Sequence, residues 1–141
     1  MAHLGVLEVL ERHHIRIDLI VGSSIGSFIG ALYADLPDVF SLKEILFPLK
    51  TRHMVSFNPF VNRGGLWNDR SMRHFLNQHL NALSFEDLSI PLIVTTTDLM
   101  NGEPLYLSGG ELINPICASC AVPLFFTPKP LYGRLLIDGG V

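Results

Sequence analysis

Apolar residues follow two different spacings along the chain, and the changes between them divide it into helices and strands. A spacing of three and four residues is typical of a helix with one buried face, as at Leu4, Leu7 and Leu10. This spacing predicts helices over residues 4–14, 27–35, 41–48, 69–80 and 112–121. Continuous apolar runs rich in β-branched residues are typical of buried strands, and they occur at residues 15–21 and 90–97.

Turn residues complete this outline. Asn101-Gly102 is a strong hairpin signal, so residues 103–107 are expected to return beside the strand at 90–97. A second turn, at Gly133, separates two more short strands near the end of the chain. Strands that alternate with helices predict a single α/β domain, a three-layer α/β/α arrangement around a mainly parallel sheet.

Two local patterns refine the helices. Ser41 and Glu44 have the spacing of a capping box, and Asp69 occupies the position of an N-cap. The helix at 27–35 follows Gly26 and contains Gly30 and Ala34, so small residues recur every four positions. We expect this nearly bare helix face to pack closely against the sheet.

Composition narrows the class of protein. The chain has 141 residues, 48% of them hydrophobic, and a net charge of −3, which predicts one folded domain over residues 1–141. No run of Lys and Arg is present, so nucleic acid is not an expected partner. No apolar run reaches the roughly 18 residues of a transmembrane helix, and acidic residues near the start argue against a signal peptide. A cytoplasmic location is therefore the default expectation.

The strongest chemical motif is Gly22-Ser23-Ser24-Ile25-Gly26, which fits G-x-S-x-G between a predicted strand and a predicted helix. This context is typical of a nucleophile elbow, with the central serine on a sharp turn and the next backbone N–H facing an oxyanion. The two glycines allow strand and helix to approach closely. A phosphate-binding turn is the alternative, but the motif lacks a P-loop ending and dinucleotide spacing.

A serine nucleophile needs a base. Asp138 follows the apolar strand 135–137 and precedes Gly139 and Gly140, at a strand end of the kind where α/β active sites gather. Asp98, also at a strand end, is the competing carboxylate. The histidines fall on predicted loops and helices, away from apparent strand ends: His3, His13, His14, His53, His74 and His79.

Four blocks, in this order, make the chain resemble the patatin-like phospholipase family. The first two are Ala2-His3-Leu4-Gly5-Val6-Leu7 and Asp18-Leu19-Ile20-Val21-Gly22-Ser23-Ser24-Ile25-Gly26. The others are Thr97-Asp98-Leu99 with Gly102-Glu103, and Ala118-Ser119-Cys120-Ala121-Val122-Pro123 with Asp138-Gly139-Gly140. The resemblance covers essentially the whole chain, and Asp138 lies 114 positions after Ser24.

The resemblance implies a hydrolase that cleaves lipid acyl esters through a Ser–Asp dyad. Ser24 would attack the acyl carbonyl, Asp138 would take its proton, and the backbone N–H of Ile25 would bind the oxyanion. Neither a cofactor nor a metal is implied. An acyltransferase or a thioesterase would use the same acyl-serine, and the residues do not separate these activities.

Two departures from the family affect this expectation. The family's glycine-rich loop and the strand before it, which precede the block at 2–7, are not in this sequence, and family members continue well past the Asp-Gly-Gly block. The chain therefore resembles a domain truncated at both ends. We expect weak activity and a tendency to aggregate. A non-catalytic fragment or pseudoenzyme is the alternative function, and secretion or membrane association stays open.

The remaining motifs have simpler interpretations. Cys117 and Cys120 form C-x-x-C, but no further zinc ligands are evident, so buried small apolar side chains are expected. Phe57, Phe60 and Trp67 flank a glycine-rich loop. One interpretation is an apolar lip that contacts acyl chains or a membrane surface. The other, which we favour, is that these aromatic side chains pack into a small satellite core.

Overall fold

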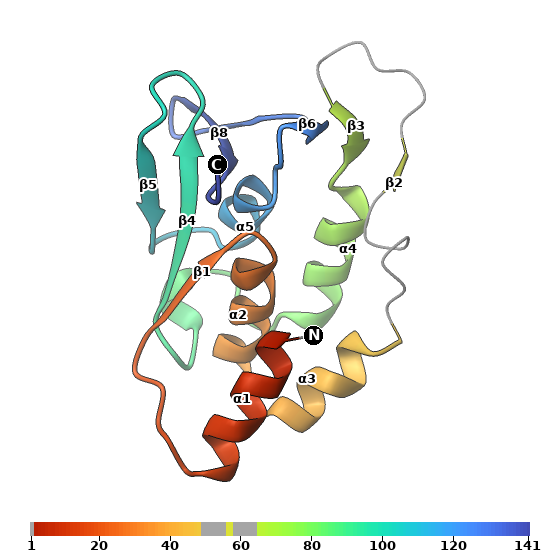
Figure 1. The fold of residues 1–141 in the computed structure, drawn as a ribbon, viewed down its shortest axis with the longest axis vertical. Coiled ribbons are helices and arrows are strands. Elements are labelled where there is room, and N and C mark those ends of the chain that lie inside the picture. The colour runs from red at the N-terminus through yellow and green to blue at the C-terminus, as the bar shows by residue number, and fades with distance from the viewer. Residues whose placement is uncertain (1, 49–55, 58–64) are drawn as a thin grey trace.

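The computed structural model describes residues 2–48, 56–57 and 65–141, which form an open sheet beside a group of helices (Figure 1). The helices are α1 (Ala2–Arg12), α2 (Ile25–Asp35), α3 (Val39–Leu46), α4 (Arg70–His79), the short 3₁₀ helix η2 (Phe85–Asp87) and α5 (Ile113–Ser119). The strands are β1 (Ile20–Ser23), β2 (Ser56–Phe57), β3 (Gly65–Asn68), β4 (Leu92–Asp98), β5 (Pro104–Leu107), β6 (Leu124–Phe126), β7 (Lys129–Leu131) and β8 (Arg134–Asp138).

β4 organises the main sheet. β1 pairs with β4 in parallel over Leu92–Thr95, and β8 pairs with it antiparallel over Thr96–Asp98. β5 is antiparallel to β4 over Val94–Thr97, which overlaps both of these registers. Since a strand has only two edges, β5 occupies one edge of β4, and β1 and β8 share the other.

The α/β class and its α/β/α architecture are confirmed, but the expected mainly parallel sheet is wrong. Only β1 pairs in parallel within this sheet, whereas β5, β8 and β7 all pair antiparallel. Short connections are the physical reason for the β4–β5 and β7–β8 pairs, because a tight turn can join only antiparallel neighbours. Gly102 (φ 72°) turns the chain between β4 and β5, and Tyr132-Gly133 (φ 52° and 72°) turns it between β7 and β8.

The strand at the nucleophile motif is shorter and more exposed than expected. The predicted buried strand at 15–21 is regular only from Ile20 to Ser23, and within β1 only Gly22 is buried. Val21 is 59% exposed. The reason is that β1 pairs on one side alone among the described residues, so it forms an edge of the sheet.

The core lies where α2 and α5 pack against the sheet and against each other. Eight successive residues of α2, from Ser27 to Ala34, are buried. The expected small-residue packing is confirmed at Gly30, where an added Cβ would lie 3.0 Å from Ile20 Cγ2. α4 contributes Phe75, whose ring stacks on Phe28 at 5.5 Å between centroids.

Two helix caps differ from expectation. α3 begins after Asp38, whose carboxylate accepts from the N–H of Phe40 at 3.2 Å and of Ser41 at 3.0 Å, so Asp38 and not Ser41 is the N-cap. Asp69 stands at the N-cap position of α4 but makes no cap bond there. Its carboxylate instead pairs with Arg73 at 2.6 Å and with Lys129 at 2.9 Å.

A second, smaller sheet joins β2, β3 and β6. β3 is antiparallel to β2 and parallel to β6, so a segment expected to be loop supplies two strands. The sequence pattern did not indicate β6, because three residues carry too little periodicity. Within the described parts of the chain, no helix combines the length and the apolar character needed to span a bilayer.

We predict that Leu136→Ala lowers the free energy of unfolding by about 2–5 kcal/mol, because Leu136 is fully buried and the truncation leaves a cavity. Urea unfolding followed by circular dichroism measures this change. Leu83→Ala, at a leucine that is 78% exposed, is the matched control and should change stability by less than about 0.5 kcal/mol. Equal losses in the two variants would contradict the described core.

Candidate active site

β1 and β8 run toward each other along one edge of β4 and end face to face. Ser23, the last residue of β1, lies opposite Thr95, and Asp138, the last residue of β8, lies opposite Thr96. Because Thr95 and Thr96 are consecutive, the two strand ends meet at one point of the sheet. The register therefore places the end of β1, which Ser24 follows directly, next to the end of β8 at Asp138, despite the long sequence separation.

Ser24 occupies the sharp turn expected of a nucleophile elbow. Its backbone has φ 52° and ψ −128°, a conformation that L-residues rarely adopt. Such a conformation costs on the order of 1–3 kcal/mol and persists only where neighbouring groups hold it. Here the Ser24 N–H donates to Ser119 Oγ at 2.9 Å, and Ser27 donates to the Ser24 carbonyl from Oγ at 2.7 Å and from N at 2.9 Å.

Glycine is required at two positions of this turn region by close backbone contacts. A Cβ added to Gly22 would lie 2.6 Å from Ser27 Cα, and one added to Gly139 would lie 2.3 Å from the Thr95 carbonyl oxygen. Both distances are far below a normal contact. At Gly26 the space is wider, because an added Cβ would meet only the His3 ring at 3.6 Å.

The start of α2 lies directly after Ser24 and presents backbone N–H groups. Ile25 is the first residue of this 11-residue helix, so its N–H belongs to the first turn and has no acceptor within the helix. The helix dipole adds positive potential at the same end. This is the arrangement that stabilises an oxyanion beside the residue that precedes the helix.

Asp138 is buried at the end of β8 and only half of its carboxylate is engaged. Its Oδ1 accepts from the Gly140 N–H at 2.8 Å, and its own N–H donates to the Ala121 carbonyl at 3.0 Å. Among the described residues, Oδ2 is buried and has no hydrogen-bond partner. Buried polar atoms are almost always paired, so an unpaired carboxylate oxygen at a strand end is a feature of functional sites.

Asp98, the competing carboxylate, is already paired with other groups. It accepts from the Met100 N–H at 3.0 Å and from the Arg134 guanidinium at 2.8 Å. The backbone bond from Met100, together with the Arg134 charge, holds the pKa of Asp98 below its usual range. A carboxylate stabilised in its charged form is a poor proton acceptor, so Asp138 is the better candidate base.

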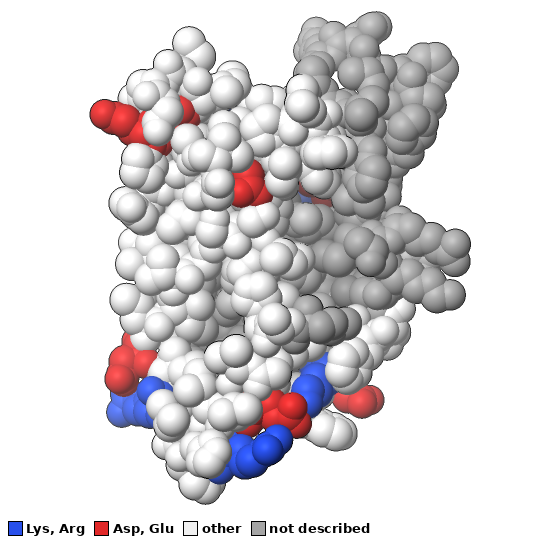
Figure 2. Space-filling model, in the orientation of Figure 1, with Lys and Arg blue, Asp and Glu red and all other residues white. Residues whose placement is uncertain are grey.

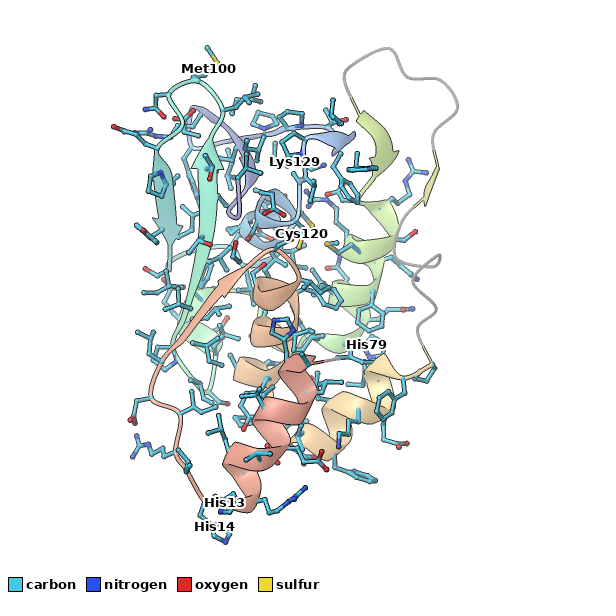
Figure 3. All side chains as sticks on the ribbon, in the orientation of Figure 1. His13, His14, His79, Met100, Cys120 and Lys129 are labelled. Atoms are coloured by element: carbon cyan, nitrogen blue, oxygen red, sulfur yellow. The ribbon has the colours of Figure 1, made fainter. Side chains whose placement is uncertain are left out.

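Of the described histidines, one lies beside the elbow. Cys120 marks the neighbourhood of the elbow, because its sulfur lies 4.0 Å from Ser27 Oγ in the first turn of α2. His13 and His14 lie at the lower end of α1, far from Cys120 (Figure 3). His79 packs against the Phe75 ring, His74 is exposed, and His53 lies outside the described residues.

His3 is the exception, and the sequence pattern did not single it out. With Ser23 and Gly26 it lines a cavity of about 340 Å³ between α1, β1 and α2. Its imidazole is exposed, so it is an alternative base to compare with Asp138 and a useful control position.

The cysteine prediction is confirmed: Cys117 and Cys120 are free and buried. Burial raises the pKa of Cys120 to about 12, which keeps this thiol protonated and unreactive at neutral pH. In the part of the chain that the structure describes, no three His, Cys, Asp or Glu side chains gather as they would around a metal.

The segment that carries the expected aromatic lip is described only in part. Phe60 lies outside the described residues, and Phe57 and Trp67 are placed only as backbone partners between β2 and β3.

Comparison with known proteins gives one consistent result. The sequence profile of patatin-like phospholipases matches residues 1–141. An NTE family protein of Mycobacterium bovis is 28% identical over 142 residues, which cover 99% of this chain and 39% of that protein. Patatin-like phospholipase domain-containing protein 6 of Homo sapiens is 31% identical over 152 residues, covering 99% of this chain and 10% of that protein.

A fungal relative has a more specific name. Lysophospholipase nte1 of Aspergillus fumigatus is 30% identical over 155 residues, which cover 99% of this chain and 10% of the relative. The chain therefore spans less than half the length of each of these three relatives.

We predict that Gly139→Ala destabilises the protein by about 1–3 kcal/mol, because its Cβ would collide with the Thr95 carbonyl. Thermal unfolding measures the effect. Gly5→Ala is the matched control, since Gly5 lies in α1 with nothing within 4 Å of an added Cβ. It should raise stability by about 0.5–1 kcal/mol through better helix propensity. Destabilisation by both variants would contradict the close approach at Gly139.

A second prediction concerns Asp98. The pKa of Asp98 is lower in the folded protein than in the unfolded chain, where it is about 3.9. The charged carboxylate therefore stabilises the fold above the unfolded-state pKa, and this stabilisation is lost as the pH falls through the folded-state pKa. The melting temperature of Asp98→Asn should therefore lie below that of the parent at pH 7, and the gap should close between about pH 5 and pH 2. Glu103→Gln, which also replaces a carboxylate by an amide but at an exposed site, is the control. A difference in melting temperature between Asp98→Asn and the parent that persists in acid would contradict the pairing of Asp98 with Arg134.

Proposed function

We propose that this chain, which belongs to the patatin-like phospholipase family, carries the nucleophile and base of a lipid acyl hydrolase. Ser24 is the nucleophile, Asp138 is the proton acceptor, and the Ile25 N–H is an oxyanion donor. One observation carries the proposal: β1 and β8 end face to face on β4, where a serine with strained backbone follows β1 and a buried carboxylate with an unpaired oxygen ends β8.

In the first half of the reaction, Ser24 Oγ attacks the ester carbonyl carbon as its proton passes to Asp138. The tetrahedral intermediate carries its negative charge on the former carbonyl oxygen, toward the start of α2. The bond from carbon to the alcohol oxygen then breaks. Asp138 returns the proton to the departing alcohol, and the acyl group stays on Ser24 as an ester.

The second half repeats these steps with water. Asp138 takes a proton from the water molecule, whose oxygen attacks the acyl carbonyl carbon. When the intermediate collapses, the bond between carbon and Ser24 Oγ breaks and Oγ recovers a proton from Asp138. A fatty acid leaves, and both residues return to their initial states.

A lipid substrate is supported by the family and by the surface. Family members are named as phospholipases, and the fungal relative is named as a lysophospholipase. Figure 2 shows charged side chains gathered at the lower end of this face and at its upper left; the broad surface between them is mostly uncharged, apart from an acidic spot and a small recessed charged patch. Among the described residues, an uncharged surface beside α2 suits an apolar acyl substrate better than a charged one.

The test is covalent labelling with a fluorophosphonate, read by intact mass on protein that circular dichroism shows to be folded. We predict one adduct on the parent and none on Ser24→Ala. Asp138→Asn should label about 10²–10⁴-fold more slowly, because loss of a general base has costs of this order. The release of fatty acid from lysophosphatidylcholine and phosphatidylcholine should follow the same ranking.

His3→Ala is the matched control, since it removes a titratable group beside the elbow that the proposed reaction does not use. It should label at the parent rate. Three results would overturn the proposal: a folded parent that takes no adduct, an adduct on Ser24→Ala, or Asp138→Asn that labels as fast as the parent.

A further inference from the structure

We propose that Ser119 is a positioning residue that holds Ser24 in its reactive conformation by accepting the hydrogen bond of the Ser24 backbone N–H. The inference rests on the proposed function of Ser24. It assigns a role to a buried hydroxyl that the dyad mechanism does not use and that lies 95 residues from the nucleophile.

The direction of the hydrogen bonds around Ser119 is unambiguous. A serine hydroxyl has one proton, and Ser119 Oγ donates it to the Thr95 carbonyl at 2.7 Å. A lone pair of the same oxygen accepts the Ser24 N–H at 2.9 Å. The two hydrogen bonds from the Ser24 N–H to Ser119 and from Ser119 to Thr95 therefore have a fixed direction, and each polarises the other.

These two hydrogen bonds tie the elbow to a carbonyl that also packs closely against Gly139, the residue after Asp138. Thr95 lies opposite Ser23 in the sheet, and its carbonyl oxygen is the atom that an added Cβ on Gly139 would strike. Ser119 thus fixes the nucleophile turn relative to the backbone against which the turn after Asp138 packs. A change at Ser119 moves Ser24 with respect to Asp138.

Ser119 differs from Ser27, the other serine that binds the elbow. Ser27 lies three residues after Ser24 and donates to its carbonyl, a bond internal to the start of α2. Ser119 lies at the end of α5, so its bond crosses between two elements and sets where the turn lies. It also occupies the N–H of Ser24, which leaves the N–H of Ile25 as the donor that faces a developing oxyanion.

The test compares Ser119→Ala, Ser119→Thr and Ser89→Ala. Ser89 Oγ donates to the Asp35 carbonyl at the opposite end of α2, so its removal is a matched loss of one hydroxyl-to-carbonyl bond. Fluorophosphonate labelling gives the maximal rate and the reagent affinity separately, and amide hydrogen exchange reports the Ser24 N–H directly.

We expect Ser119→Ala to label about 10- to 100-fold more slowly at saturating reagent with unchanged reagent affinity, since displacement by about 1 Å costs rates of this order. The Ser24 amide should exchange faster. Ser119→Thr, which keeps the hydroxyl, should recover most of the rate, and Ser89→Ala should label like the parent.

Other outcomes overturn the inference. Ser119→Ala that labels at the parent rate, or whose Ser24 amide exchanges at the parent rate, contradicts the positioning role. So does a folded Ser119→Thr as slow as Ser119→Ala, or an equal loss in Ser89→Ala. A parent that takes no adduct refutes the proposed function instead, and the amide exchange of Ser24 then still decides whether Ser119 holds the turn.

Discussion

The edge of β4 at Thr95 and Thr96 is the constraint on which the site depends. Two strands of opposite direction use this edge and end against each other, so the register of the sheet decides what meets there. A slip of one residue in either strand would turn its side chains to the other face of the sheet. The hydrophobic core under β4 holds both strands in this register, and it therefore also fixes where the end of β1 lies relative to the end of β8.

Crowding at this edge explains why strain can be kept. Gly22 and Gly139 pass so close to neighbouring backbone that neither has room for a Cβ, and Ser24 has an unfavourable conformation between them. Four hydrogen bonds to the Ser24 backbone offset part of this strain. A turn enclosed in this way fixes the backbone of Ser24 and so limits where its side chain can lie.

Much of the fold could be read from local pattern. The hairpin at Asn101-Gly102 is present because left-handed backbone at glycine closes a two-stranded turn, and this depends on neighbouring residues only. The direction of the other pairings could not be read, because it depends on which strands share β4. The cap of α3 was also misassigned, since Asp38 and Ser41 both have suitable side chains and only the start of the helix distinguishes them.

By itself, the sequence determined the local chemistry: a glycine-flanked serine between a strand and a helix, and an aspartate before two glycines. Short-range sterics and backbone preferences suffice for such features. Only the tertiary structure decided that Asp98 is paired with Arg134 while Asp138 keeps an unpaired oxygen, and that Ser119 binds the elbow. The physical reason is distance along the chain, because contacts between remote residues follow from sheet register and helix packing, which no local pattern encodes.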